Sequence, residues 1–362
     1  LAIVLISGSM VSAAEEAELN NPFTYLSPRP GAAYVFPGTS ILLRSDQFAV
    51  SKLLQSNQFL VEGSESGKHS GEAELASDGR TVIFHPNTPF TPGESVKVTI
   101  RLSEMKLFSD NSGDFTFAFS ISEPGLQEPD IVNEIQQPLA QNHSRTVTDK
   151  KIPPYDYLTA PSDLPPIAVE RRPGELGEGY LFVSIFNFDS FGSVPGYALI
   201  LDNNGEPVYY DRPHGVPVAV DFKKQPNGLL TYSAPDPNTN GFFGLNNRYE
   251  IVDEYMAEGY TTDFHDLQLL DNGNALLLIH DLQTVDMSKL TPGGSTEAPV
   301  IGCIIQEVDQ DNKKLFQWRS WDYIDILDTN RPLDDDPLRY IHCNSIELDH
   351  DGHILISSRH LD

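Results

Sequence analysis

Cationic residues are scarce in this sequence. Its 362 residues include 24 Lys and Arg against 52 Asp and Glu, so the formal net charge is −28. Nucleic acids and anionic membrane surfaces are bound by basic protein surfaces, so neither is expected as a partner. The simplest interpretation is a solvated acidic surface. An anionic substrate would therefore need a locally cationic pocket within a field that repels it.

Cysteine is nearly absent, and long apolar segments are missing. The two cysteines, Cys303 and Cys343, can pair in an exported protein or remain as buried thiols, and they form no metal-binding motif. The opening run "LAIVLISGSMVSAAEE" is too short to span a bilayer but is typical of the end of a signal peptide. Residues 1–14 are therefore predicted to be a signal-peptide remnant, and the protein to be exported to the periplasm or outside the cell.

Several common catalytic motifs are also missing. The sequence contains no Gly-rich phosphate loop, no G-x-S-x-G elbow and no H-E-x-x-H helix. Its histidines lie too far apart in the sequence to suggest a metal-ligand spacing, so neither a metal nor a cofactor is expected. A metal-dependent hydrolase is kept as a weaker alternative.

What the chain does contain is a series of short β-forming segments. Residues 22–122 alternate β-formers with Gly and Pro turns, which predicts an immunoglobulin-like β-sandwich used as a spacer or docking module. Residues 123–177 are rich in Pro, Gln, Glu and Asp and are expected to form an extended linker. The predicted fold class is therefore all-β.

Residues 178–362 contain a repeat. Gly-containing turns precede apolar strands in "QPNGLLTY", "LDNGNALLL" and "DHDGHILIS", and these alternate with turns that lead into aromatic strands. Two hairpins per unit are typical of propeller blades. About three blades fit here, fewer than a closed propeller needs, so we expect a partial β-propeller from a chain truncated at both ends.

The last hairpin, "HCNSIELDHDGHILISSRH", carries polar residues at its outer ends. A two-residue turn at Asp351–Gly352 would place Asn344 opposite Arg359. His342 would share their face, since side chains alternate along a strand. The expected pocket therefore combines a forked guanidinium, a neutral amide donor and an imidazole.

The preceding hairpin has a similar pattern. With its turn at Asn272–Gly273, His265 is expected to pair with His280, at the level of Asn344 and Arg359 in the next unit. The corresponding residue of the first unit is the apolar Val220. Each histidine can equally be a scaffold residue that joins neighbouring strands, and a one-residue bulge would break these pairings.

These hairpins, together with "GYALILDNNGEPVYY" and "IIQEVDQDNKKLFQWRSWD", resemble the bacterial, PAPS-independent arylsulfotransferase family over about residues 178–362. The resemblance implies a six-bladed propeller that moves a sulfuryl group from a phenolic sulfate ester to a phenol acceptor through a sulfohistidine. It implies catalytic roles for His265, His342 and Arg359, and substrate binding by Asn344. His280 is added as a substrate-binding residue because the expected hairpin places it opposite His265.

The resemblance also marks a difference. The family's sulfated histidine lies in a "QHD"-type segment, which the printed sequence does not contain. The nucleophile is therefore expected beyond residue 362, and the printed chain is expected to be inactive by itself. The alternative from another functional class is a non-catalytic extracellular propeller that binds a ligand or a partner.

Overall fold

The computed structural model describes residues 21–102 except 55, then 113–123, 177–185, 196–212, 219–234 and 241–361, with four single residues between 160 and 167. Within these residues, the regular structure is β-strand with short 3-10 turns, and no α-helix occurs among them. The prediction of an all-β fold is confirmed. No helix in the described part of the chain is long and apolar enough to cross a membrane. The predicted signal remnant and most of the predicted linker lie outside the described residues.

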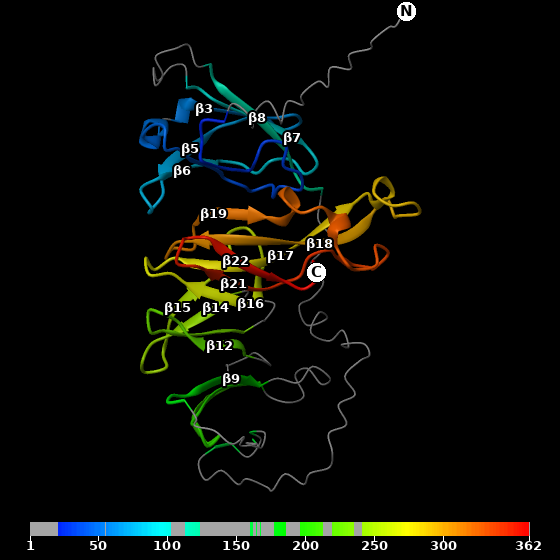
Figure 1. Ribbon diagram of the computed structural model, residues 1–362. Helices are drawn as coiled ribbons and strands as arrows, with labels where there is room; N and C mark the ends of the chain where they lie inside the picture. The colour runs from blue at the N-terminus through cyan, green and yellow to red at the C-terminus, as the bar shows by residue number, and fades with distance from the viewer. Residues whose placement is uncertain are drawn as a thin grey trace, which may run out of the picture.

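Two antiparallel sheets form the N-terminal part of the molecule (Figure 1). One sheet has the order β1 (Tyr25–Ser27), β2 (Ile41–Arg44), β6 (Thr81–Pro86), β5 (Gly71–Leu75). The other has the order β4 (Gly67–His69), β3 (Phe59–Gly63), β7 (Ser95–Ile100), β8 (Phe115–Ser120). Alternate residues of β8 are buried, and one apolar core takes residues from both sheets. This arrangement is the expected β-sandwich, while its immunoglobulin-like topology and the domain limits remain predictions.

Within its described residues, the second half of the chain forms four successive sheets. The first contains β9 (Leu181–Ile185), β10 (Tyr197–Leu201) and β11 (Pro207–Asp211). The second contains β12 (Val220–Lys224), β13 (Leu230–Ser233), β14 (Phe242–Leu245) and β15 (Ile251–Tyr255). The third contains β16 (Thr262–Leu269), β17 (Ala275–Val285), β18 (Ala298–Val308) and β19 (Lys314–Arg319), with β20 (Leu338–Arg339) parallel to β18. The last is the hairpin of β21 (Cys343–Leu348) and β22 (Ile354–Ser358).

The first strands of these sheets lie next to one another, in the order β9, β12, β16, β21. Side chains bond across each junction. Ser184 accepts the backbone N–H of Phe222 at 3.1 Å. Gln225 bonds the backbone of Leu267 and Leu269, Asp266 accepts the N–H of Ile346 at 2.7 Å, and Gln268 accepts that of Leu348 at 2.6 Å. Sheets joined through their first strands are the arrangement expected of propeller blades, and the number of blades remains a prediction.

The register of the hairpins differs from the prediction by one residue. Leu348 pairs with Ile354 and Leu269 with Ala275, because each turn contains three residues rather than two. In the last hairpin, Gly352 has φ +80° and its N–H bonds the carbonyl of Asp349. This is the three-residue loop in which a left-handed residue forms a bulge, and not the two-residue turn that we assumed.

The same turn recurs along the chain. The corresponding residues, all with positive φ, are Gly205, Gly228, Tyr249, Gly273, Asn312 and Gly352. In the sequence, Pro226 already indicated this type of turn at residues 225–228, because proline favours the second position of a type I turn.

The sandwich packs against the outer strand of the third sheet, and Figure 1 shows β19 below the sandwich strands. The Tyr25 hydroxyl accepts the N–H of Gln317 at 2.7 Å and donates to its carbonyl at 3.3 Å. The buried Arg319 donates to the carbonyls of Ala33 and Tyr34 at 2.6 and 2.9 Å. Leu315 joins a small apolar cluster with sandwich residues. The edge of this sheet is therefore covered rather than open.

Candidate functional site

The candidate site is built around a bulge in β16. Thr262 pairs with Ile279, but the next paired residue is Leu267, opposite Leu277. The four intervening residues, 263–266, therefore face a single residue of the partner strand, Leu278, so their side chains are directed away from a regular ladder. Because bulges redirect side chains in this way, a strand that otherwise belongs to the core can present polar groups.

Asp263 is the buried centre of this bulge, and it is 3% exposed. Its Oδ1 accepts the backbone N–H of His265 at 2.6 Å and lies 2.6 Å from the ring Nδ1 of His265. Its Oδ2 lies 2.7 Å from Nε2 of His280 on β17. Burial by itself would raise the pKa of Asp263, but the imidazoles of His280 and His265 hold that pKa well below its usual value. Asp263 is therefore an anion at neutral pH, and it holds two imidazole rings.

A third imidazole completes the cluster. His342 comes directly before β21 and is 7% exposed. Its ring centroid lies 4.9 Å from that of His265 and 5.6 Å from that of His280. The rings of His265 and His280 are 5.8 Å apart. We call Asp263, His265, His280 and His342 the histidine cluster.

His360 lies beside this cluster, with its ring centroid 5.8 Å from that of His342. Burial lowers the pKa of His360, and the guanidinium groups of Arg331, Arg359 and Arg339 lower it further. His360 is therefore a neutral imidazole in a locally cationic environment, within a chain whose net charge is −28.

The predicted pairing of His265 with His280 is wrong, although both residues meet at Asp263. His265 lies in the bulge, and His280 is opposite Cys303 on β18. The prediction made them cross-strand neighbours in the sheet. In the structure each ring instead contacts the carboxylate of Asp263.

The predicted pairing of Asn344 with Arg359 is also wrong. Asn344 is the extra residue between the Cys343–Ser358 and Ser345–Ser357 pairs, and it is half-buried. Arg359 follows β22, its side chain is exposed, and its backbone N–H bonds the carbonyl of His342 at 2.9 Å. The functional roles of both residues remain predictions.

The two cysteines lie beneath the cluster. Both are buried free thiols, and they contact each other side chain to side chain. Burial raises the pKa of the Cys303 thiol well above its usual value. The Cys303 thiol is therefore not activated as a nucleophile at neutral pH.

Sequence reasoning missed Asp263 as the residue that organises the site. The signal was the run Asp263-Phe264-His265-Asp266, in which two acidic residues flank an aromatic residue and a histidine on a strand. Phe264 is buried and stacks on His265 at 4.4 Å. Asp266 makes other contacts, because it accepts hydrogen bonds from Lys223 and from the backbone N–H of Ile346.

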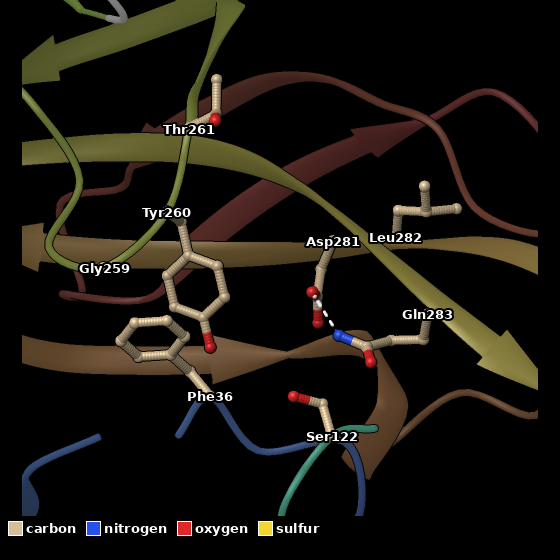
Figure 2. A pocket seen from close by; sticks show the side chains of 8 residues that line it. All are labelled: Phe36, Ser122, Gly259, Tyr260, Thr261, Asp281, Leu282 and Gln283. Atoms are coloured by element: carbon tan, nitrogen blue, oxygen red, sulfur yellow. Dashed lines mark hydrogen bonds between the residues drawn. The ribbon is translucent and has the colours of Figure 1, made fainter. Parts of the chain in front are cut away.

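A separate open pocket of about 490 Å³ lies between the sandwich and the third sheet (Figure 2). Phe36 and Tyr260 line it with their rings 5.5 Å apart. Its Asp281 accepts from Gln283 at 2.7 Å and from the Trp321 indole at 2.9 Å. Because Asp281 follows His280 in β17, their side chains point to opposite faces, so this pocket is distinct from the histidine cluster.

Comparison with known proteins identifies the family. Residues 174–362, just over half of the chain, match the family model described as Arylsulfotransferase (ASST). The chain therefore belongs to the arylsulfotransferase family, whose general chemistry is the transfer of sulfuryl groups to and from aryl compounds. No curated protein matches this chain.

Solved structures give only weak similarities. The copper resistance protein PcoC from Escherichia coli is 14% identical, with 27% of this chain and 97% of that one covered and a TM-score of 0.21. The LD transpeptidase LdtMt1 in complex with imipenem is 8% identical, with coverages of 79% and 76% and a TM-score of 0.22. The S-layer protein rSbsC(31–844) is 11% identical, with coverages of 78% and 45% and a TM-score of 0.21. At these scores the similarities carry no functional argument.

Proposed function

We propose that the protein transfers a sulfuryl group from a phenolic sulfate ester to a phenol acceptor through a sulfohistidine. The observation that carries this proposal is the histidine cluster held on Asp263 within the region that matches the family model. In the first step, the bond from sulfur to the donor oxygen breaks while a bond from sulfur to an imidazole nitrogen forms. The second step reverses this on the acceptor phenol.

The cluster suits the proton transfers that accompany these steps. With Nδ1–H directed to Asp263, a neutral His265 presents Nε2 as a base, and a protonated His265 presents it as a donor. The ring can therefore take the proton of the acceptor phenol or supply one to the leaving phenolate. Asp263 stabilises the imidazolium form and fixes the orientation of the ring.

The surroundings of His360 suit the anionic substrate. Sulfuryl transfer requires that the sulfate group be positioned and that its oxygens be neutralised. The guanidinium groups of Arg331, Arg339 and Arg359 lower the pKa of His360, whose ring lies 5.8 Å from that of His342. We propose that this cationic region, with Asn344, binds the sulfate oxygens. The nucleophilic histidine is expected in a segment outside the printed sequence, as the family resemblance implies.

We also propose that the protein acts outside the cytoplasm. The opening apolar run with small residues after it supports export, as does the strongly acidic composition. Fractionation of cells that express the full-length protein tests this proposal. Recovery from the cytoplasm alone would contradict it.

The activity test uses the full-length protein with p-nitrophenyl sulfate and a phenol acceptor. We expect release of p-nitrophenol that depends on the acceptor, together with a sulfated histidine peptide detected by mass spectrometry. Arg359→Ala should lower turnover by roughly 100- to 1,000-fold, as does loss of one donor from such a site. Its melting temperature should change little, because Arg359 is exposed.

The matched control is Arg248→Ala, which removes an exposed arginine from the turn between β14 and β15. It should leave turnover unchanged. Absence of p-nitrophenol release across pH values and acceptors would overturn the proposal. Tight binding of the ester without turnover would support the non-catalytic propeller instead.

A further inference from the structure

Three potential metal-ligand atoms converge at Asp263, which the proposed transfer does not require. A carboxylate oxygen of Asp263, Nδ1 of His265 and Nε2 of His280 all lie within 4.8 Å of one another. Each imidazole thus directs a ring nitrogen toward the carboxylate of Asp263. From these contacts we propose that Asp263, His265 and His280 bind a divalent transition-metal ion, with Zn²⁺ as the representative ion.

The chemistry of the three atoms suits such an ion. Zn²⁺ binds imidazole nitrogen and carboxylate oxygen, and open Zn²⁺ sites use three protein ligands with a further position for water or another ligand. The ring of His342, 4.9 Å from that of His265, belongs to the same cluster. Hard ions such as Mg²⁺ prefer oxygen ligands and are not expected here.

The site is also preorganised. Asp263 receives the backbone N–H of His265 at 2.6 Å, so its carboxylate cannot turn away without losing that bond. Phe264 stacks on the His265 ring at 4.4 Å and fixes its plane. The side chains are 0% exposed for Asp263, 22% for His265 and 17% for His280, while Nε2 of His280 and Oδ2 of Asp263 are themselves buried.

Charge balance favours an exchange of protons for the metal. With both rings protonated, the anionic carboxylate and two imidazoliums carry one net positive charge. A divalent ion with two neutral rings and the same carboxylate also carries one. Binding therefore releases up to two protons, and its affinity should rise as the pH increases through the range in which the imidazoles lose their protons.

One consequence of metal binding concerns sulfuryl transfer, and that consequence rests on the proposed function. Metal and proton compete for the same nitrogen atoms, so bound Zn²⁺ removes the ring N–H groups that the proposed transfer uses. Zn²⁺ is therefore expected to inhibit sulfuryl transfer reversibly. Metal binding itself is measured without any aryl sulfate, so its outcome is independent of whether the protein is a sulfotransferase.

The test uses the full-length protein without an affinity tag, treated with chelator and titrated with ZnCl₂ in a calorimeter. We expect one site, with proton release measured by repeating the titration in buffers of different ionisation enthalpy. Loss of a residue just outside a metal's ligands already costs roughly 10- to 100-fold in affinity. Asp263→Asn and His280→Gln, which each remove a ligand, should therefore cost at least that much.

Two control variants address the other places where Zn²⁺ can bind. Asp349, Asp351 and His353 form a second group of ligand atoms on the β21–β22 turn, where the His353 side chain is 78% exposed. His353→Gln removes that group, and Cys343→Ser removes one of the two thiols beneath the cluster. Both variants should keep the site.

The outcomes separate clearly. Absence of a stoichiometric site in the unaltered protein overturns the proposal, as does a site that survives both Asp263→Asn and His280→Gln. Loss of the site in His353→Gln or Cys343→Ser would assign the metal elsewhere and overturn it too. Because Asp263 is buried, its substitution can disturb the fold, so far-ultraviolet circular dichroism of Asp263→Asn is measured as well. His280→Gln provides a second, separate test of the metal ligands.

Discussion

At the scale of single residues, the cluster shows how a buried carboxylate organises a strand that mixes polar and apolar residues. Burial opposes ionisation of Asp263, yet two imidazoles and one backbone N–H reverse that preference. A buried charge is tolerated when it is paired and hydrogen-bonded. Asp263 meets that condition, and it holds His265 and His280 in place at the same time.

Asp221 shows the opposite balance. Its side chain lies beside Lys223, with Oδ2 2.6 Å from Nζ, and Lys223 also pairs with Asp266. Burial raises the pKa of Asp221 to about 6, the nearby Asp266 adds to this, and Lys223 only partly offsets it. The ionised form of Asp221 is therefore costly in the folded protein.

This imbalance predicts a pH-dependent gain in stability from Asp221→Asn. Between about pH 4 and 6 the folded protein binds more protons at Asp221 than the unfolded chain does, so stability falls as the pH rises. Asparagine cannot ionise, and it tolerates the φ of +53° at this position. The stability of the variant relative to the unaltered protein should therefore increase by up to about 3 kcal/mol between about pH 4 and 7.5.

Urea unfolding midpoints of both proteins at several pH values measure this difference. Asp271→Asn, on the exposed turn between β16 and β17, is the control and should give a difference that does not change with pH. If the difference in stability between Asp221→Asn and the unaltered protein is also independent of pH, ionisation of the Asp221 carboxylate does not destabilise the folded protein.

At the scale of secondary-structure elements, one turn type sets the register of the hairpins in the second half. A residue with left-handed φ ends each of these turns. It shifts every pair by one residue relative to a two-residue turn. Bulges in β12, β16 and β21 then interrupt the ladders near the residues that carry the chemistry.

Gly352 tests the importance of this conformation. Its φ is +80°, and an added Cβ would meet no atom within 4 Å, so the cost of a substitution there is conformational alone. Gly352→Ala should lower the free energy of unfolding by about 1 kcal/mol, and Gly352→Asn should cost less, because asparagine visits the left-handed region more readily. Asn312 already occupies the corresponding position of the β18–β19 turn, with φ +59°.

Denaturant unfolding of the two variants measures the difference between them. Gly113→Ala is the control, because an added Cβ there meets nothing and the backbone is not left-handed. If Gly352→Ala and Gly352→Asn lose the same stability, the conformational explanation fails.

At the scale of the whole molecule, the sandwich and the third sheet are joined by buried polar contacts as well as apolar ones. Arg319 is 2% exposed, bonds two sandwich carbonyls and pairs with Asp322 at 3.3 Å. Tyr34 and Trp321 pack with their rings 5.1 Å apart across the same interface. The sandwich thereby supports the sheet that supplies His265 and His280.

Arg319→Met should uncouple this interface. The change removes the guanidinium that pairs with the buried Asp322 and leaves only the weaker influence of Arg29, and breaking such a buried pair typically costs about 3–5 kcal/mol. Trp318 and Trp321 are the two tryptophans of the chain and both lie near this interface, so tryptophan fluorescence reports its unfolding. We expect a fluorescence midpoint at clearly lower denaturant than in the unaltered protein.

Two further variants calibrate that result. Arg319→Lys keeps the charge but not the forked donor, so it should recover part of the loss. Arg248→Met, on an exposed turn, should leave the midpoint unchanged. A normal midpoint in Arg319→Met would mean that the interface does not contribute to stability.

Local patterns in the sequence were sufficient for the fold class and for the repeated hairpins. Alternation of apolar residues and the recurring Gly-containing turns are short-range signals, so they can be read without knowing the partner strands. The order of the motifs was also sufficient for the family, which the match over residues 174–362 confirms. His265 and His342 were chosen on the same grounds and His280 from the expected hairpin, and the structure brings their three rings together.

Only the tertiary structure decided how those rings meet. The bulge at residues 263–266 depends on pairing between strands, and the burial of Asp263 depends on the neighbouring sheets, so neither is a property of one segment. The same holds for the contact between Arg319 and the sandwich, which joins residues nearly 300 positions apart in the chain. The sequence by itself determined which groups were available. Long-range packing decided which of them were desolvated, because the free energy of a charged group depends on everything that surrounds it.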